Sequence, residues 1–262
     1  MSINQILINT LKNNFLNIYA IWLREFKVYL RERSRLVASL FTPLLWLFIV
    51  GSGLGSTTTL SIDVNYQQFI FPGIISMSII FTSVFYGAYI IWDRKFDFLK
   101  SVMVAPVSRE IIFIGKTFGG MTNSLIQVFM LLIIGFFIGI DYTLISLVQI
   151  IFVSITLSFL LTALGLGLGS NMQSLEGFQM IVSFVVFPLF FLSGALFPLD
   201  NLPDWLSFLT IIDPAAYAVD ALRNSILGIA TYSFELDLLL LFCATIVTTF
   251  FGILSFRKMR AV

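Results

Sequence analysis

The sequence predicts an all-α, polytopic integral membrane protein with six transmembrane helices. Hydrophobic residues make up 58% of the chain and charged residues only 11%, whereas a soluble domain carries about 25% charged residues. Phenylalanine alone occurs 29 times in 262 residues. A soluble core of this length could not cover so much apolar surface, so lipid must be the solvent of most side chains.

Six apolar runs are long enough to cross a bilayer, which takes about 20 residues per helix. They are Leu36–Ser56, Phe69–Trp92, Thr117–Ile140, Leu144–Leu168, Met180–Leu199 and Leu238–Phe256. None contains Asp, Glu, Lys or Arg. Only Asp141 to Thr143 separate the third run from the fourth, which predicts a tight antiparallel pair. Glycine pairs four residues apart, such as Gly115 and Gly119, indicate close helix contacts, either within the subunit or at a dimer seam.

Basic residues are distributed unevenly between the two sides of the predicted bundle. All except Arg223 precede the first run, separate the second from the third, or follow the sixth. Because Lys and Arg concentrate in cytoplasmic loops, we expect both termini in the cytoplasm. The excess of Phe, Ile and Asn indicates an AT-rich genome. The expected location is therefore a bacterial cell (inner) membrane or, alternatively, a plastid membrane.

Residues 1–35 predict an amphipathic helix ahead of a six-span domain covering residues 36–262. Apolar residues recur in this segment at spacings of three and four, and basic residues fall largely on the other side. The apolar residues are Leu11, Phe15, Ile18, Trp22, Phe26 and Tyr29. Such a helix lies in the headgroup plane of a membrane. It either anchors the chain to lipid only or also contacts a cytoplasmic partner.

The chain lacks the residues that several kinds of chemistry need. The chain has no histidine and one cysteine, Cys243, which lies in an apolar run. Charges at membrane depth are kept mainly for function, and the predicted spans carry none, which argues against proton coupling. We therefore expect no catalytic residue, no metal site and no cofactor in this chain. The net charge of +1 gives no reason to expect nucleic acid.

The stretch Gly115-Lys116-Thr117 looks like the end of a nucleotide-binding loop. That loop needs a glycine five residues before Gly115, and the chain has Glu110 there. A carboxylate at that position would repel phosphate, and no strand is predicted before it. The chain is not expected to bind ATP itself.

A long connection, Asp93–Lys116, joins the second and third runs. Helical spacing of apolar residues predicts a short helix that Pro106 ends, after which Ser108 caps the next helix. Candidate contacts for a soluble partner are Asp97, Leu99, Lys100, Met103, Pro106 and Arg109. The alternative is a solvated loop on the membrane surface.

The segment after the fifth run is apolar but interrupted. Candidates for an external gate are Gly194, Pro198, Pro203 and Trp205. Asp213 and Pro214 form a good helix start, and Asp220 and Arg223 are spaced to pair. The pattern predicts short helices that dip back toward the membrane, either as a gate or as a cap that only packs.

Few polar side chains lie in the spans. Candidates for a solute path are Thr82, Ser83, Tyr86, Tyr89, Asn123, Gln127 and Asn171. Together with the Phe-rich fifth run, this composition suits a drug, a lipid or a lipid-linked glycan better than an ion.

Three stretches resemble the integral-membrane permeases of type-2 ABC exporters, the family of drug-resistance, nodulation-factor and polysaccharide exporters. The first is Phe71-Pro-Gly-Ile with Ser83-Val-Phe-Tyr-Gly87. The second is Asp93-Arg-Lys, Ala105-Pro-Val-Ser-Arg109 and Gly115-Lys116. The third runs from Phe191-Leu-Ser-Gly-Ala-Leu-Phe-Pro-Leu-Asp200 through Leu202-Pro, Asp213-Pro214, Tyr217 and Asp220-Ala-Leu-Arg223 to Gly228. The third stretch is the most specific, and with the six-span layout the likeness extends from about Ile21 onward.

The resemblance implies a separate soluble ATPase subunit that hydrolyses ATP, and a pair of permeases around the path. A coupling helix would fall within Asp97–Pro106, and the N-terminal helix would also touch the ATPase. Gly115-Lys116 would then mark the start of the third span. Family members often have Gly-Thr-Leu-Glu where this chain has Asp97-Phe-Leu-Lys100, so no specific ion pair is carried over to Lys100.

The expected function is that of a permease subunit of an ATP-driven exporter for a hydrophobic or amphipathic solute. The expected partners are the ATPase subunit, membrane lipid and a second copy of the chain. Two alternatives stay open: a carrier or flippase that works without ATP, and a membrane assembly factor that transports nothing.

Overall fold

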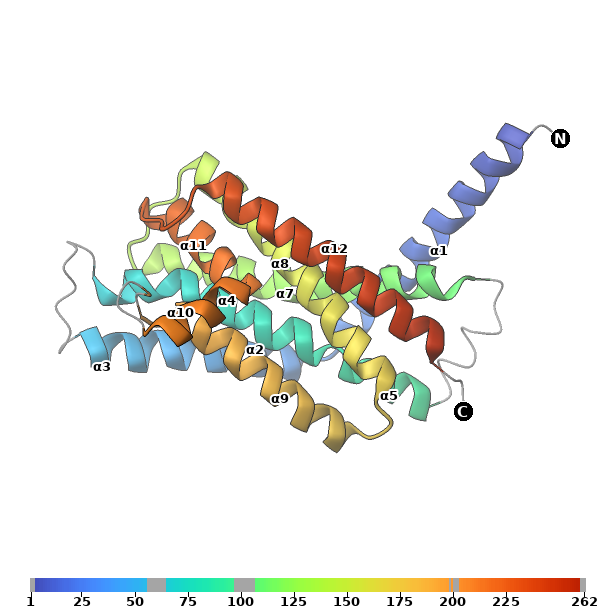
Figure 1. The fold of residues 1–262 in the computed structure, drawn as a ribbon, viewed down its shortest axis with the longest axis horizontal. Helices are drawn as coiled ribbons and strands as arrows, with labels where there is room; N and C mark the ends of the chain where they lie inside the picture. The colour runs from blue at the N-terminus through green and yellow to red at the C-terminus, as the bar shows by residue number, and fades with distance from the viewer. Residues whose placement is uncertain (1–2, 56–64, 97–106, 198, 200–202, 260–262) are drawn as a thin grey trace.

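The computed structural model describes residues 3–55, 65–96, 107–197, 199 and 203–259. Every regular element within these ranges is a helix (Figure 1). The elements are α1 (Ile3–Arg31), α2 (Arg33–Leu45), the π-helical η1 (Trp46–Val50), α3 (Gly51–Gly55), α4 (Tyr66–Phe85), α5 (Ala88–Lys95), α7 (Arg109–Phe137), α8 (Leu144–Asn171), α9 (Leu175–Leu192), α10 (Asp204–Ile212), α11 (Pro214–Leu227) and α12 (Phe234–Lys258).

Six stretches of the described chain are long and apolar enough to cross a membrane, which confirms the predicted all-α, polytopic fold. They are Leu36–Gly53, Tyr66–Lys95, Arg109–Phe137, Leu144–Asn171, Leu175–Leu192 and Phe234–Lys258. The third and fourth form the expected antiparallel pair. Thr143 caps α8 by accepting a hydrogen bond from the backbone N–H of Ser146 at 3.1 Å.

Helix α4 forms the centre of the bundle. Every side chain from Phe69 to Ile80 is buried, and α7, α8, α9 and α11 pack around this helix. Helix α12 lies across α8 (Figure 1). Because lipid tails are as apolar as the spans, close packing rather than the hydrophobic effect must hold these helices together.

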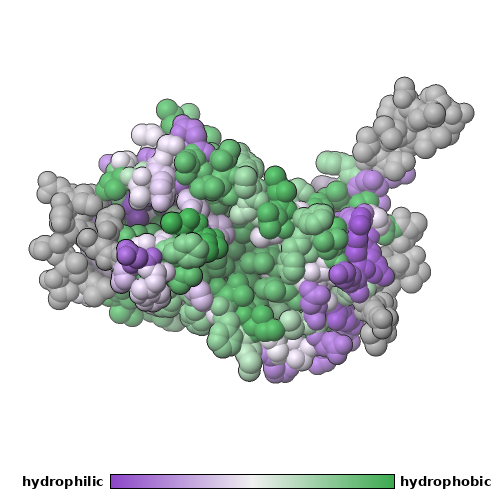
Figure 2. All heavy atoms as spheres, viewed as in Figure 1, coloured by the Kyte–Doolittle hydropathy of each residue, from purple (hydrophilic) through white to green (hydrophobic). Residues whose placement is uncertain are grey.

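The outward sides of α7, α8, α9 and α12 expose aromatic and aliphatic side chains to the surrounding lipid. Examples are Phe129, Phe137, Ile145, Phe184, Ile246 and Phe250. Figure 2 shows apolar residues over the middle of one face and hydrophilic residues toward its two ends.

We use the term basic end for the end of the bundle that carries Arg94, Lys95, Arg109, Arg257 and Lys258. Helices α5 and α12 end there, and α7 begins there (Figure 1). Helices α10 and α11 lie at the opposite end.

The second span is not the continuous helix that the sequence predicts. It breaks between α4 and α5 at Tyr86 and Gly87. A Cβ added at Gly87 would lie 2.0 Å from the carbonyl oxygen of Gly165 on α8. The break therefore occurs where the two backbones meet, and only glycine permits that approach.

The fifth span ends earlier than predicted, at Leu192 rather than Leu199. Gly194 then adopts a left-handed conformation with φ of 71°, which helices do not continue through. The expected bent pair follows, with α10 and α11 meeting at 84°. Asp213 starts α11 as predicted, because its Oδ1 accepts from the backbone N–H of Ala215 at 2.8 Å.

The N-terminal helix α1 has two different halves. Its first turns project away from the bundle (Figure 1), and Phe15 is exposed. Its later turns pack on α7, where Trp22 Nε1 donates to Thr122 Oγ1 at 2.8 Å. Tyr29, near the end of α1, is buried.

Candidate functional site

A cluster of charged side chains is buried inside the basic end. Lys116 of α7 is only 1% exposed. Its Nζ donates to Glu25 Oε1 of α1 at 2.9 Å and also to Asp93 Oδ2 of α5. We call Glu25, Asp93 and Lys116, together with Arg24 and Tyr86, the buried ion cluster. It joins three elements that are far apart in the chain.

Glycines on α7 allow α1 to come close enough for these contacts. A Cβ at Gly119 would lie 2.6 Å from Glu25 Cβ, and one at Gly115 would lie 2.9 Å from Ile21 Cβ. The glycine pair noted in the sequence therefore forms a surface on which α1 packs within the subunit. Lys116 lies between these glycines and faces the same helix.

The cluster is balanced in charge and well supplied with donors. Arg24 Nη1 donates to Glu25 Oε1 at 2.6 Å, and its Nη2 lies 3.5 Å from Asp93 Oδ1. The Tyr86 hydroxyl donates to Glu25 Oε2 at 2.8 Å. Two carboxylates thus face two cations, which is the condition under which buried charges are tolerated.

The electrostatic state of Glu25 follows from these partners. Burial alone would raise the pKa of this carboxyl. The charge and hydrogen bond of Lys116, helped by Arg24 and Tyr86, outweigh burial and lower the pKa below its ordinary value. Glu25 is therefore ionised at neutral pH, and α1 is bound to the bundle by charge as well as by packing.

Sequence reasoning missed this cluster. Lys116 was assigned to the basic connection before the third span, but α7 begins at Arg109 and carries Lys116 inside the helix. The helices of the second and third spans extend beyond the predicted runs and carry Asp93 and Lys116, although the runs themselves contain no charged residue. A signal was present: Glu25 lies on the apolar stripe with Ile18, Trp22 and Tyr29, and a carboxylate on such a face requires a partner.

Most of the predicted docking contacts cannot be placed. Asp97, Leu99, Lys100, Met103 and Pro106 lie outside the described residues. Arg109 is described, and its Nη1 donates to the carbonyl oxygens of Arg257 at 2.6 Å and Met259 at 2.9 Å. Arg109 thus ties the start of α7 to the end of α12.

The same junction contains the predicted helix cap and a second ion pair. Ser108 caps α7 by accepting from the N–H of Ile111 at 3.4 Å, as expected. Arg257 Nε donates to Glu110 Oε1 at 2.6 Å.

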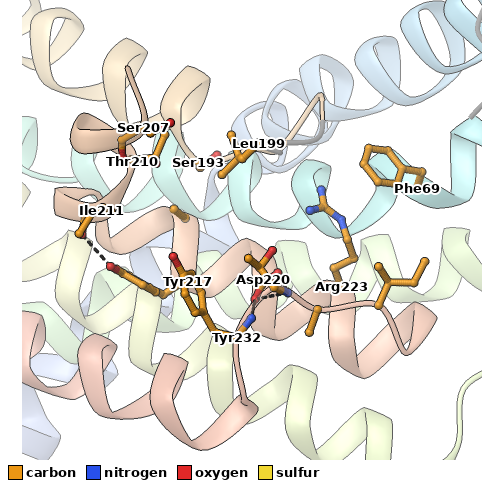
Figure 3. A pocket seen from close by; sticks show the side chains of 14 residues that line it. Phe69, Ser193, Leu199, Ser207, Thr210, Ile211, Tyr217, Asp220, Arg223 and Tyr232 are labelled. Carbon is orange, nitrogen blue, oxygen red and sulfur yellow. Dashed lines mark hydrogen bonds between the residues drawn. The ribbon is translucent and has the colours of Figure 1, made fainter. Parts of the chain in front are cut away.

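At the opposite end, α10, α11 and neighbouring segments enclose a pocket of about 400 Å³. Arg223 Nη2 donates to the Gly194 carbonyl at 2.7 Å, and its guanidinium lies 4.4 Å from the centre of the Phe69 ring. Asp220 instead accepts from the backbone N–H groups of Thr231 and Tyr232. Figure 3 shows these side chains around the pocket. Among the described ion pairs, none joins Asp220 to Arg223, so that predicted pairing is wrong.

The four gate candidates are not equivalent. Gly194 is held by Arg223 at the turn after α9. Pro203 immediately precedes α10, and Trp205 on that helix is 67% exposed. Pro198 lies outside the described residues. Neither Gly194 nor Trp205 lines the pocket, but Gly194 is hydrogen-bonded to Arg223, which does.

The path candidates fall into separate places. Thr82 Oγ1 donates to Gln127 Oε1 at 2.6 Å, and the Ser83 and Ser124 hydroxyls share a hydrogen bond of 2.7 Å. Asn123 is buried one turn before Gln127 on α7.

Other candidates lie elsewhere. Tyr86 belongs to the buried ion cluster. Asn171 lies at the end of α8, where its Nδ2 donates to the Gly167 carbonyl at 2.9 Å. Tyr89, one of the other path candidates, lines the region beside Glu32 at the basic end.

Six spans, a bent helix pair after the fifth span and a first helix packed on α7 characterise a polytopic all-α membrane protein. Residues 17–227 match the family described as ABC-2 type transporter. The chain belongs to this family and is therefore a membrane permease of the ABC transporter class.

Similar curated proteins agree with this assignment. The putative transport permease ycf38 of Porphyra purpurea is 32% identical over 217 residues, covering 79% of this chain and 72% of the relative. The inner membrane transport permease YadH of Escherichia coli K12 is 30% identical over 222 residues, with 80% and 82% covered. Nodulation protein J of Rhizobium leguminosarum bv. viciae is 26% identical over 223 residues, with 84% and 85% covered.

Proposed function

We propose that this chain is the permease subunit of an ATP-driven exporter for a hydrophobic or amphipathic solute. A separate soluble subunit hydrolyses the ATP. The buried ion cluster supports this proposal most directly, because it fixes α1 to α5 and α7 at the basic end. A partner that moves α1 thereby moves the second and third spans.

The proposed arrangement places the basic end in the cytoplasm, in a bacterial inner membrane or a plastid membrane. The excess of Lys and Arg at that end supports this orientation. Two copies of the chain enclose the solute path, and lipid surrounds the exposed apolar sides of α7, α8, α9 and α12.

The proposed mechanism is a shift between two conformations. ATP binding closes the ATPase pair, and the contacts at the basic end bias the permease toward its outward-open state. Such a shift requires ATP and solute to bind the two states with different affinities. Neither ATP nor any other cofactor is bound by the permease in this scheme.

Co-purification tests the proposal. An ATPase with a complete phosphate-binding loop, co-expressed with this chain, should be retained by it in detergent. Lys100→Glu should weaken this retention, whereas the matched change Lys258→Glu, at the same end but outside the connection, should not.

Other outcomes would select the alternatives. Retention of the ATPase after Lys100→Glu counts against the docking assignment. Solute transport that persists without ATP supports a carrier or flippase. Absence of both ATPase stimulation and solute accumulation in a deletion strain supports an assembly factor.

A further inference from the structure

A second cavity, of about 220 Å³, lies between α1, α2, α4 and α7. We call it the membrane pocket and define it by Thr42, Met77, Ser78, Phe81, Thr82 and Gln127. These residues belong to the first, second and third spans, so the pocket lies at membrane depth. Thr42 is exposed on α2 at its rim, which leaves a route from the lipid.

One polar group in this pocket is left unmatched. Gln127 is fully buried, and its Oε1 accepts from Ser78 at 2.9 Å and from Thr82 at 2.6 Å. Its Nε2 has no hydrogen-bond partner in the part of the chain that the structure describes. A buried donor without a partner costs about 1–3 kcal/mol, so a ligand that accepts this hydrogen bond regains that free energy.

The rest of the lining is apolar or neutral. Met77 and Phe81 contribute apolar surface, and the described lining residues include no Asp, Glu, Lys or Arg. A charged ligand would therefore lose its hydration without gaining a counter-ion. A neutral molecule avoids that loss.

The α2 wall of the pocket is an irregular helix. Pro43 lines the pocket from within α2 and has no N–H to continue the helical hydrogen bonds. The π-helical η1 follows three residues later, at Trp46. Helix irregularities of this kind are frequent at functional sites.

We propose that the membrane pocket binds a neutral, largely apolar molecule through one hydrogen-bond acceptor, such as a ketone, ester or ether oxygen, which receives the free N–H of Gln127. The assignment of this ligand as the transported solute rests on the proposed function. Binding itself does not, because it requires only the permease.

A matched pair of probes tests the pocket in purified permease reconstituted in lipid nanodiscs. Benzophenone has a carbonyl acceptor between two rings, and diphenylmethane has a methylene group there instead. On illumination benzophenone inserts into nearby C–H bonds, and methionine reacts readily. Mass spectrometry should find the label on Met77, and titration of the probes gives their dissociation constants.

Gln127→Leu should weaken benzophenone binding about tenfold relative to diphenylmethane, a factor that corresponds to ~1.4 kcal/mol. Gln179→Leu makes the same change at an exposed position on α9 and should leave this ratio unchanged. Thr42→Trp adds a large side chain at the exposed rim, where substitutions usually change stability little, and should abolish labelling of Met77.

Labelling that avoids Met77, or a probe ratio that Gln127→Leu leaves unchanged, would overturn the proposal. If Gln127→Leu does not fold, labelling of Met77 that survives Thr42→Trp would overturn it equally. If the permease binds the probe as expected but does not associate with an ATPase, the proposed function is refuted and the ligand-binding proposal is retained. If the permease associates with the ATPase but does not bind the probe, only the ligand-binding proposal is refuted.

Discussion

Replacing Lys116 by methionine is the sharpest test of the buried ion cluster. The methionine side chain has a similar length but no charge, so the change removes the cation that faces both Glu25 and Asp93. Arg24 then remains as their described cationic partner, and it lies at 3.5 Å from Asp93. Both carboxylates stay buried but lose the positive charge of Lys116, which contacts each of them.

The expected loss follows from that imbalance. Removing one partner of a buried ion pair destabilises a protein by about 3–5 kcal/mol. For a chain of this size, each kcal/mol lowers the midpoint of thermal unfolding by roughly 2–4 °C. We therefore expect Lys116→Met to lower the melting temperature by roughly 6–20 °C, the product of these two ranges.

Thermal unfolding of detergent-purified protein, followed by intrinsic fluorescence, measures this shift. Lys258→Met is the control, because Lys258 is exposed at the same end. The triple variant Glu25→Gln, Asp93→Asn, Lys116→Met should recover most of the loss, since neutral groups are cheaper to bury than unpaired charges. A single variant as stable as the control, or a triple variant as unstable as the single one, would refute the reasoning.

Three further predictions concern other contacts. The lowered pKa of Glu25 means that its contribution to stability is present above its ordinary pKa of 4.5 and disappears as the pH falls through the lower folded value. Glu25→Gln should therefore flatten the dependence of the melting temperature on pH below 4.5, and an unchanged slope would contradict this. Gly87→Ala should destabilise the protein by about 1–3 kcal/mol or more, because its Cβ would overlap the backbone of Gly165. Gly53→Ala, with open space around it, is the control, and equal melting temperatures of the two variants would count against the close contact. Asp220→Ala should remove the hydrogen bonds to the backbone N–H groups of Thr231 and Tyr232 and lower the stability by roughly 1.5–3 kcal/mol. Amide hydrogen exchange at these two residues, just before α12, should become faster; rates equal to those of the wild type would show that the carboxylate does not hold this turn.

Much of this fold could be predicted because a membrane imposes simple rules. Each span must be an apolar helix of a minimum length, and caps such as Ser108 and Asp213 are local features. The break at Gly87 could not be predicted, because it depends on the backbone of Gly165, which approaches only in the folded bundle.

The site was harder to predict than the fold for a related reason. Hydropathy averages over a window, so one Lys at the start of an apolar run reads as a loop residue. The partners of Lys116 come from elements 91 and 23 residues earlier in the chain. Only the carboxylate of Glu25 on an apolar helix face indicated that such a partner was needed.

The chain order of the buried ion cluster also constrains biogenesis. Glu25 and Asp93 both leave the ribosome before Lys116, so neither acid has this counter-ion while the first two spans are being inserted. Because α7 supplies both Lys116 and the glycines on which α1 packs, the first helix reaches its final position only after the third span has been made. Packing of the first helix on the third span is then a late event of membrane integration. A nascent chain truncated before Lys116 should still expose that helix to proteases.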